Sequence, residues 1–269
     1  MHKTLRDLIT EMGRELVCRV NDGEPLGIIE QHLVQKLASV DSIKLVISAY
    51  NRRNTEDKNL FQNVNELGKY VATMNLLDGH VNYARGSRVY GMSISLTNID
   101  LFEHFSFVFD NSESMAFTIE NGKITGFPLS RDRGRGRFVV GLGRIFTLSA
   151  SSYQELEDTS LRSLGSTTVS LVQVIRGRMD IFITKTKMWT IWWALGLSHY
   201  GCLFVEDLVR NESIHKNYLG YLSDPGRTIY IACYRNCYIR REFKHLLTDI
   251  TELAGEGRGK NHAFVQESR

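Results

Sequence analysis

The chain has little cysteine, little proline and almost no net charge. Its four cysteines, Cys18, Cys202, Cys233 and Cys237, are too few and too scattered for the disulfide framework of a secreted domain. We therefore expect reduced thiols in a cytoplasmic or organelle-matrix protein that is not secreted. Three prolines beside 22 glycines exclude a proline-rich or collagen-like chain. A net charge of +3 is too small to predict a nucleic-acid partner by itself.

Long hydrophobic runs are also scarce. Residues 1–20 carry charges throughout and have no apolar centre, so we expect no secretory leader. Residues 188–205 are the best candidate for a membrane span, but polar side chains such as His199 interrupt them. We interpret this stretch as a buried core helix and expect no membrane association. Because one helix cannot bury both Trp192 and Trp193 on a narrow stripe, we expect one of them to reach an interface.

What remains is the composition of a globular protein with both helices and strands. Apolar residues make up 42% of the chain and charged residues 23%, which is enough for a sizeable core. Apolar spacing and β-branched runs predict helices at 1–20, 26–40, 189–201 and 242–253, a helical pattern from residue 154 through 166–177, and strands at 44–50, 105–110, 115–120, 139–148, 179–183 and 227–233. Residues 51–65 are predicted to be a loop, and residues 69–96 to be β-rich around a polar turn. The pair Asn121-Gly122 predicts a hairpin, because both residues accept a positive φ.

Nothing in the sequence marks a second domain. We find no internal repeat and no linker long enough to separate two units. We predict a single domain over residues 1–253 and a disordered, Gly-rich tail at 254–269.

Three segments carry motif-like patterns in a fixed order. They are NLLDGHVNYARG at residues 75–86, LGSTTVSLVQVIRGRMDIF at 164–182 and MWTIWWALGLSHYGC at 188–202. Together they resemble the motifs D-P-x-D-G-T-x-N-F…G, L-G-S-A-A-x-D-L…A-x-G-R-x-D-x-Y and W-D-x-A-A-G…E-A-G-G of the inositol monophosphatase family of metal-dependent sugar phosphatases. The matching positions are Asp78, Gly79, Asn82, Gly86, Leu164, Gly165, Ser166, Leu171, Gly177, Arg178, Asp180, Trp189, Ala194 and Gly201.

The resemblance implies a fold and an assembly. The fold is α+β, a layered α/β/α/β/α sandwich of the inositol monophosphatase type. The chain between Ala150 and Leu164 is shorter than in the family, so we expect the second half to be abridged. Family members commonly dimerise, which makes a homodimer or another protein complex the expected assembly. Asp180 matches a structural position at a junction between a helix and a strand.

The departures from the family pattern concern the metal ligands. Family members hold Mg²⁺ with carboxylates, and the ions polarise the phosphoryl group and activate a water. By the resemblance, Asn75 and Thr190 stand where the family has aspartates, and His80 stands where it has the threonine that helps orient the attacking water. SAYNRR, at residues 48–53, replaces the acidic residues after the first strand. Only Asp78 remains of the expected ligands, so we expect Mg²⁺ to bind weakly or not at all, and no other cofactor.

We therefore expect a protein with this fold that lacks phosphatase activity and acts as a binding or scaffold subunit. Two alternatives stay open. In the first, the old pocket binds a small anionic metabolite or performs altered chemistry, with Asp78 and His80 as an acid–base pair. In the second, a residual Mg²⁺-dependent phosphomonoesterase uses weak neutral ligands. The residues expected to line the pocket are Asn75, Gly79, Ser166, Thr167 and Thr190.

Several of these features have an ordinary structural interpretation as well. Asp78 suits the capping of a turn as well as it suits a metal, and His80 suits a backbone carbonyl contact. The run RDRGRGR, from Arg131 to Arg137, is similar to RNA-binding segments, but no aromatic residue alternates with its arginines. We favour a solvated loop there over a nucleic-acid site. The spacing in CYRNC, at residues 233–237, is not that of a zinc site.

Overall fold

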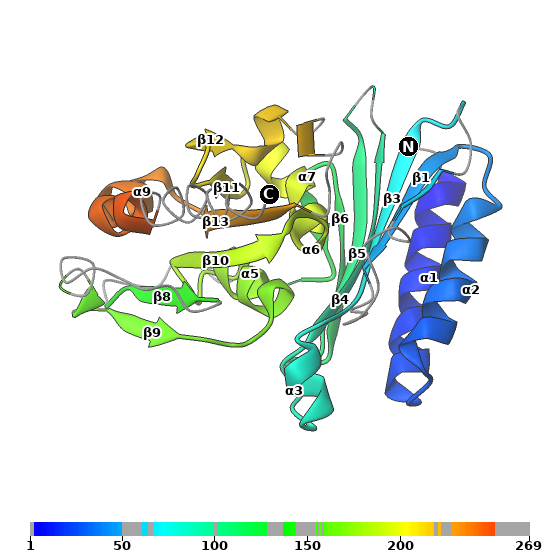
Figure 1. Cartoon of the computed structure of the whole chain (residues 1–269), viewed down its shortest axis with the longest axis horizontal. Helices are drawn as coiled ribbons and strands as arrows, with labels where there is room; N and C mark the ends of the chain where they lie inside the picture. The colour runs from blue at the N-terminus through cyan, green and yellow to red at the C-terminus, as the bar shows by residue number, and fades with distance from the viewer. Residues whose placement is uncertain are drawn as a thin grey trace, which may run out of the picture.

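Two β-sheets and three helical layers stack in the order α/β/α/β/α (Figure 1). The computed structural model describes residues 3–49, 61–63, 67–98, 100, 102–127, 137–143, 154, 156–157, 159–217, 220–221 and 227–250. The α+β class and the layer order predicted from the sequence are confirmed.

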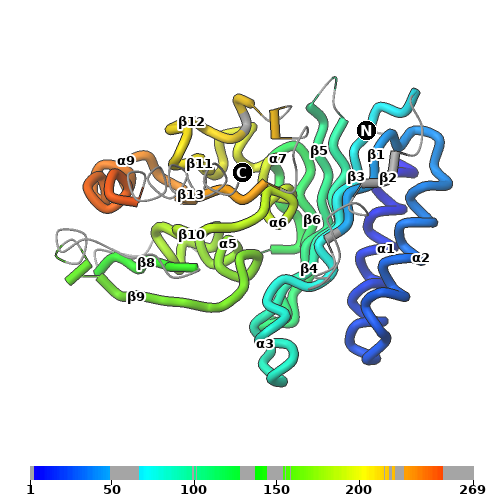
Figure 2. Tube along the Cα trace, viewed as in Figure 1, coloured from blue at the N-terminus to red at the C-terminus, as the bar shows by residue number. Residues whose placement is uncertain are grey.

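The first outer layer consists of two helices that lie side by side along the first sheet (Figures 1 and 2). They are α1 (Lys3–Asn21) and α2 (Leu26–Ala38), and both lie where the sequence predicts them. Apolar residues recur every three or four positions, so each helix buries one stripe against the sheet. The buried apolar side chains are Leu5, Ile9, Met12, Leu16 and Val20 in α1, and Ile29, Leu33 and Leu37 in α2.

The first sheet has seven strands in the order β2-β1-β3-β4-β5-β6-β7. Their bounds are β1 (Ile43–Ala49), β2 (Phe61–Asn63), β3 (Tyr70–Asp78), β4 (Gly91–Asn98), β5 (His104–Asp110), β6 (Met115–Glu120) and β7 (Lys123–Thr125). β1 and β3 run parallel, and the other neighbours are antiparallel. The parallel pair brings the carboxyl ends of β1 and β3 to the same edge of the sheet, where the candidate site lies.

The predicted Asn-Gly hairpin joins β6 to β7. Asn121 has a φ of 45° and Gly122 a φ of 83°, as this type of turn requires. The hairpin prediction is therefore confirmed.

The middle layer contains α5 (Thr167–Ile175) and a second helical segment. The sequence predicts that second segment as one helix at 189–201, but it is broken into α6 (Met188–Ile191), the 3₁₀ turn η1 (Trp192–Ala194) and α7 (Leu195–His199). Trp192 and Trp193 are both fully buried, whereas Trp189 is only partly buried. The expectation that one of the pair reaches an interface is wrong, because this segment lies between two sheets and has apolar neighbours on both sides.

The second sheet has six strands in the order β12-β11-β13-β10-β8-β9. Their bounds are β8 (Val139–Leu142), β9 (Ser160–Arg162), β10 (Ile181–Lys187), β11 (Phe204–Asp207), β12 (Glu212–Ser213) and β13 (Thr228–Tyr234). A 3₁₀ turn, η2 (Ile214–Asn217), follows β12. The outer face is covered by α9 (Cys237–Glu242) and the helical residues 244–250.

Asp180 lies at the junction that the resemblance implies. Its Oδ2 accepts a hydrogen bond from the Val139 N–H at 2.7 Å, and its own N–H donates to the Val139 carbonyl at 2.8 Å. These two bonds fix the start of β8 against the start of β10. The structural interpretation of Asp180 is confirmed.

Some local predictions fail. The expected loop at 51–65 contains β2, which pairs antiparallel with β1. The polar turn within 69–96 is a short helix, α3 (His80–Ala84). The helical pattern expected from residue 154 is interrupted by β9 (Ser160–Arg162), and α5 begins only at Thr167. These errors arise where tertiary pairing or a single glycine, rather than periodicity, decides the local structure.

Several expectations fall wholly or partly outside the described residues. They concern most of the loop at 51–65 and of SAYNRR at 48–53, most of the arginine-rich run at 131–137, the end of the strand expected at 139–148, part of the shortened stretch after Ala150, the end of the helix expected at 242–253, and the tail at 254–269. Membrane insertion can be assessed for the rest: none of the helices in the described ranges is long and apolar enough to cross a bilayer. All four cysteines are free, and only Cys233 is buried.

Candidate functional site

The candidate site is built where the end of β3 meets the first turn of α5. Asp78 is the last residue of β3, and Gly79 follows it with a φ of 97°. A Cβ at Gly79 would lie 2.9 Å from the Val89 carbonyl oxygen and 3.1 Å from the Ser166 Cβ. The turn after β3 therefore packs directly on α5, and only glycine fits there without strain.

Asp78 is held by α5. Its Oδ2 accepts a hydrogen bond from the Ser166 hydroxyl at 3.0 Å and a further one from the Thr168 N–H. The Ser166 Oγ in turn accepts from the Val169 N–H at 3.2 Å, as an N-cap does. The carboxylate thus satisfies backbone N–H groups that a helix N-terminus leaves open, and the helix dipole favours its negative charge.

The electrostatic environment of Asp78 has two opposing causes. Burial raises the pKa of its carboxyl group, because an enclosed charge loses its hydration. Hydrogen bonds from Thr167, Thr168 and Ser166 oppose that rise. The pKa of Asp78 is raised overall, because the surrounding donors stabilise the carboxylate less than bulk water does.

Asn82, another motif residue, braces the same junction. Its Nδ2 donates to the Val89 and Leu164 carbonyl oxygens, each at 2.8 Å. Gly165 has a φ of 72°, and a Cβ there would lie 2.8 Å from the Asn82 Nδ2. The matched Asn and Gly positions therefore connect α3, the entry to β4 and the entry to α5, which is a structural role.

Asn75 and Thr190 lie deeper than Asp78. Asn75 is 5% exposed and pairs in register with Ala49 of β1 and Ser93 of β4. Its Nδ2 has no hydrogen-bond acceptor within the part of the chain that the structure describes. Thr190 is 9% exposed on α6, which packs against β1 and β3. Both side chains are neutral, so this end of the sheet carries no charge from them.

His80 is the first residue of α3 and is partly exposed. It is separated from Asp78 only by the left-handed Gly79. The structure thus brings Asp78, Gly79, Ser166 and Thr167 to one junction. That Asp78 and His80 act together on one cavity stays a prediction.

Beside this junction lies a polar floor that was not predicted from the sequence. In β4, Met92, Ile94 and Leu96 face α1, while the alternate residues face the middle layer and are buried and polar. Together with β3 and β5 they form a polar stripe that consists of Thr73, Ser93, Ser95, Thr97, His104 and Ser106. The strict alternation in GMSISLTN signals this pattern, because alternate residues of a strand share a face.

One end of the stripe is a closed hydrogen-bond network. His104 Nδ1 lies 2.9 Å from the Thr97 Oγ1, and its Nε2 lies 2.6 Å from the Ser106 Oγ and 3.1 Å from the Trp193 carbonyl oxygen. The Trp192 Nε1 donates to the Thr97 Oγ1 at 3.1 Å. Burial lowers the pKa of His104 to about 4, so the ring is neutral at pH 7. The network fastens the middle layer to the first sheet.

The residues present do not fit the Mg²⁺ ions that the resemblance implies. Mg²⁺ selects oxygen ligands with carboxylates among them, and here Asp78 is the one anionic side chain among the predicted ligands. Its Oδ2 already accepts two hydrogen bonds, and the buried Asn75 Nδ2 requires an acceptor, which a cation is not. Among the described residues, no group of three or more His, Cys, Asp or Glu side chains could hold a metal ion.

Comparison with known proteins gives matches of structure alone. Searches with family profiles and against curated proteins find no match. A crystal structure of 2′-AMP-bound SaIMPase-II matches with a TM-score of 0.66 and 15% identity over 97% of each chain. An IMPase/NADP phosphatase complexed with NADP and Ca²⁺ matches with a TM-score of 0.66 and 13% identity, over 91% of this chain and 95% of that one.

A third match is the extragenic suppressor protein suhB from Bartonella henselae. Its TM-score is 0.61 at 16% identity, and the alignment covers 91% of this chain and 100% of that chain. At such low identity, these likenesses concern the fold, and the chemistry of the site has to be argued from its own residues.

Proposed function

We propose that this chain, whose fold is that of the inositol monophosphatases, does not hydrolyse phosphate esters and acts as a binding or scaffold subunit. One observation carries the proposal. Asp78, the one carboxylate left among the expected ligands, is bound by the Ser166 hydroxyl and the Thr168 N–H at the start of α5. It serves the fold where a phosphatase of this type would need it for a cation.

The neutral residues around Asp78 support the same proposal. Metal-assisted hydrolysis needs a cation to polarise the phosphoryl group and to lower the pKa of a water. Asn75 and Thr190 supply no charge to hold one, and His80 stands where the attacking water would be oriented. In contrast, Gly79, Asn82 and Gly165 keep the contacts that shape the junction. This combination favours a retained fold that no longer performs metal-dependent hydrolysis.

A second candidate function is binding of a small anionic metabolite in the old pocket. It is favoured by the buried Asn75 Nδ2, whose N–H groups lack an acceptor in the described structure. An anionic or neutral oxygen of a ligand would supply that acceptor. A homodimer or a protein complex, inside the cell, remains the proposed setting for either function.

Phosphate release tests the proposal. We expect purified protein to release no phosphate from a panel of sugar and inositol phosphates, with Mg²⁺ or Mn²⁺, beyond a protein-free blank. The physical reason is that a single, hydrogen-bonded carboxylate does not hold the cations that the reaction requires. Phosphate would be measured colorimetrically at matched metal concentrations.

The control for this assay is a pair of variants. Asp78→Ala removes the junction carboxylate, and Asp7→Ala removes an exposed carboxylate on α1. Metal-dependent release that persists in D7A and vanishes in D78A would overturn the proposal, because Asp78 would then be a working ligand.

A further inference from the structure

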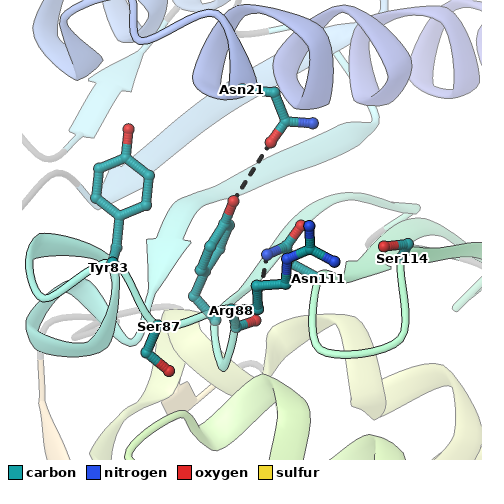
Figure 3. Close-up of a pocket in the computed structure, with 8 residues that line it drawn as sticks. Asn21, Tyr83, Ser87, Arg88, Asn111 and Ser114 are labelled. Atoms are coloured by element: carbon teal, nitrogen blue, oxygen red, sulfur yellow. Dashed lines mark hydrogen bonds between the residues drawn. The ribbon is translucent and has the colours of Figure 1, made fainter.

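A polar cleft lies on the other side of the first sheet from the Asp78 junction. Asp78 faces α5, whereas this cleft opens between the end of α1, the loop after α3 and the turn between β5 and β6 (Figure 3). Its volume is about 350 Å³, which suits a small organic molecule. Tyr83 and Tyr90 form one wall, with their rings edge to face at 5.2 Å.

The lining of the cleft carries positive charge only. Arg88 is its one ionisable group that is charged at neutral pH, and no acidic side chain is among the eight lining residues. Arg88 is exposed, so its guanidinium is accessible from solvent. Asn111 fixes the loop that carries it, because the Asn111 Nδ2 donates to the Arg88 carbonyl oxygen at 3.2 Å. The cation is thus presented from an anchored backbone.

Two neutral side chains beside Arg88 keep donor hydrogens. The Tyr90 hydroxyl donates to the Asn21 Oδ1 at 3.3 Å, and the Tyr83 hydroxyl donates to the Val20 carbonyl oxygen at 3.4 Å. The Ser87 Oγ accepts from the Val89 N–H at 3.3 Å. These bonds engage the Asn21 and Ser87 oxygens, and within the described ranges they leave the Asn21 N–H groups and the Ser87 hydroxyl hydrogen to a ligand. A guanidinium with adjacent neutral donors is complementary to an oxyanion.

We propose that this cleft binds a small organic anion through a phosphate or carboxylate group, with the Arg88 guanidinium as its cationic partner. Asn21 and Ser87 provide neutral donors on either side, and the Tyr83–Tyr90 pair supplies the wall against which the rest of the molecule rests. Asp78 is held by Ser166 and Thr168, whereas Tyr83 and Tyr90 pack in the apolar cluster of α1, so the cleft uses none of the groups that hold Asp78.

Titration followed by amide NMR chemical shifts tests the proposal on the full chain. The probes are inorganic phosphate for the phosphate source and citrate for the carboxylate source, at constant ionic strength. We expect at least one probe to cause saturable shifts at Gly86, Arg88, Asn111 and Ser114. Arg88→Gln is expected to weaken that binding by about tenfold, the effect of one charge-assisted hydrogen bond.

The matched control is Arg85→Gln, which removes the same charge from an exposed residue that does not line the cleft. Binding by R85Q should equal that of the wild type. The proposal is overturned if R85Q and R88Q weaken binding alike, if neither probe binds saturably, or if the shifts gather at residues 165–169 in place of the cleft.

Discussion

Replacing Trp192 with alanine is expected to lower the free energy of unfolding by about 3–5 kcal/mol, as removal of a large aromatic side chain from a core does. Trp192 is fully buried between the two sheets. Its Nε1 donates to the Thr97 Oγ1, which also lies 2.9 Å from the His104 ring. The substitution leaves a cavity and opens one end of a buried network. Urea unfolding followed by far-UV circular dichroism measures the change.

Trp189→Ala is the matched control for this prediction. Trp189 is partly buried, and its ring lies 5.6 Å from the Lys187 ammonium group. Its loss is expected to cost about 1 kcal/mol. If Trp192→Ala does not fold, Trp192→Phe keeps most of the volume and removes the donor, at an expected cost of about 1–2 kcal/mol. Equal losses at positions 189 and 192 would contradict the described packing.

The second large effect is a loss of stability on acidification that comes from His104. Its pKa is about 4 in the folded chain, against about 6.5 when unfolded. Between these two values the unfolded chain binds the additional proton, so stability is complete above pH 6.5 and falls as the pH drops toward 4. His104 alone is expected to remove about 2 kcal/mol of unfolding free energy between pH 7 and pH 4.5.

Two measurements isolate the contribution of His104. NMR titration of its ring should show a neutral imidazole down to about pH 5, because burial disfavours the imidazolium. In urea unfolding, His104→Gln should flatten this part of the pH dependence, whereas His32→Gln, at a half-exposed position on α2, should keep it. A His104 ring that titrates near pH 6.5 would show that the Thr97–His104–Ser106 network is open to water.

Much of the fold follows from periodic patterns in the sequence. The stripes of α1 and α2 and the alternation in β4 each specify an element and its buried face. The same periodicity misleads at residues 188–199. Their apolar run predicts one helix with a single buried stripe, but the segment lies between two sheets and breaks into α6, η1 and α7. The apolar periodicity of a segment does not show whether one face of it or several are buried in the fold.

The site was predictable in part. The motif resemblance led to Asp78, Gly79 and Ser166, and the structure places all three at one junction. It did not reveal that Thr168 would donate its N–H to Asp78, since that contact joins residues 90 positions apart. The cleft around Arg88 was missed for the same reason, because α1, α3 and the β5–β6 turn come together only in the folded chain.

We propose that this protein lacks the metal site of a phosphatase. Mn²⁺ binding, followed by electron paramagnetic resonance of the wild type, Asp78→Ala and Asp7→Ala, tests it most directly. We predict no saturable binding tighter than about 1 mM in any of the three, because Asp78, already hydrogen-bonded, is the one carboxylate among the predicted ligands that the structure describes. Stoichiometric micromolar binding by the wild type and D7A that is lost in D78A would contradict the account.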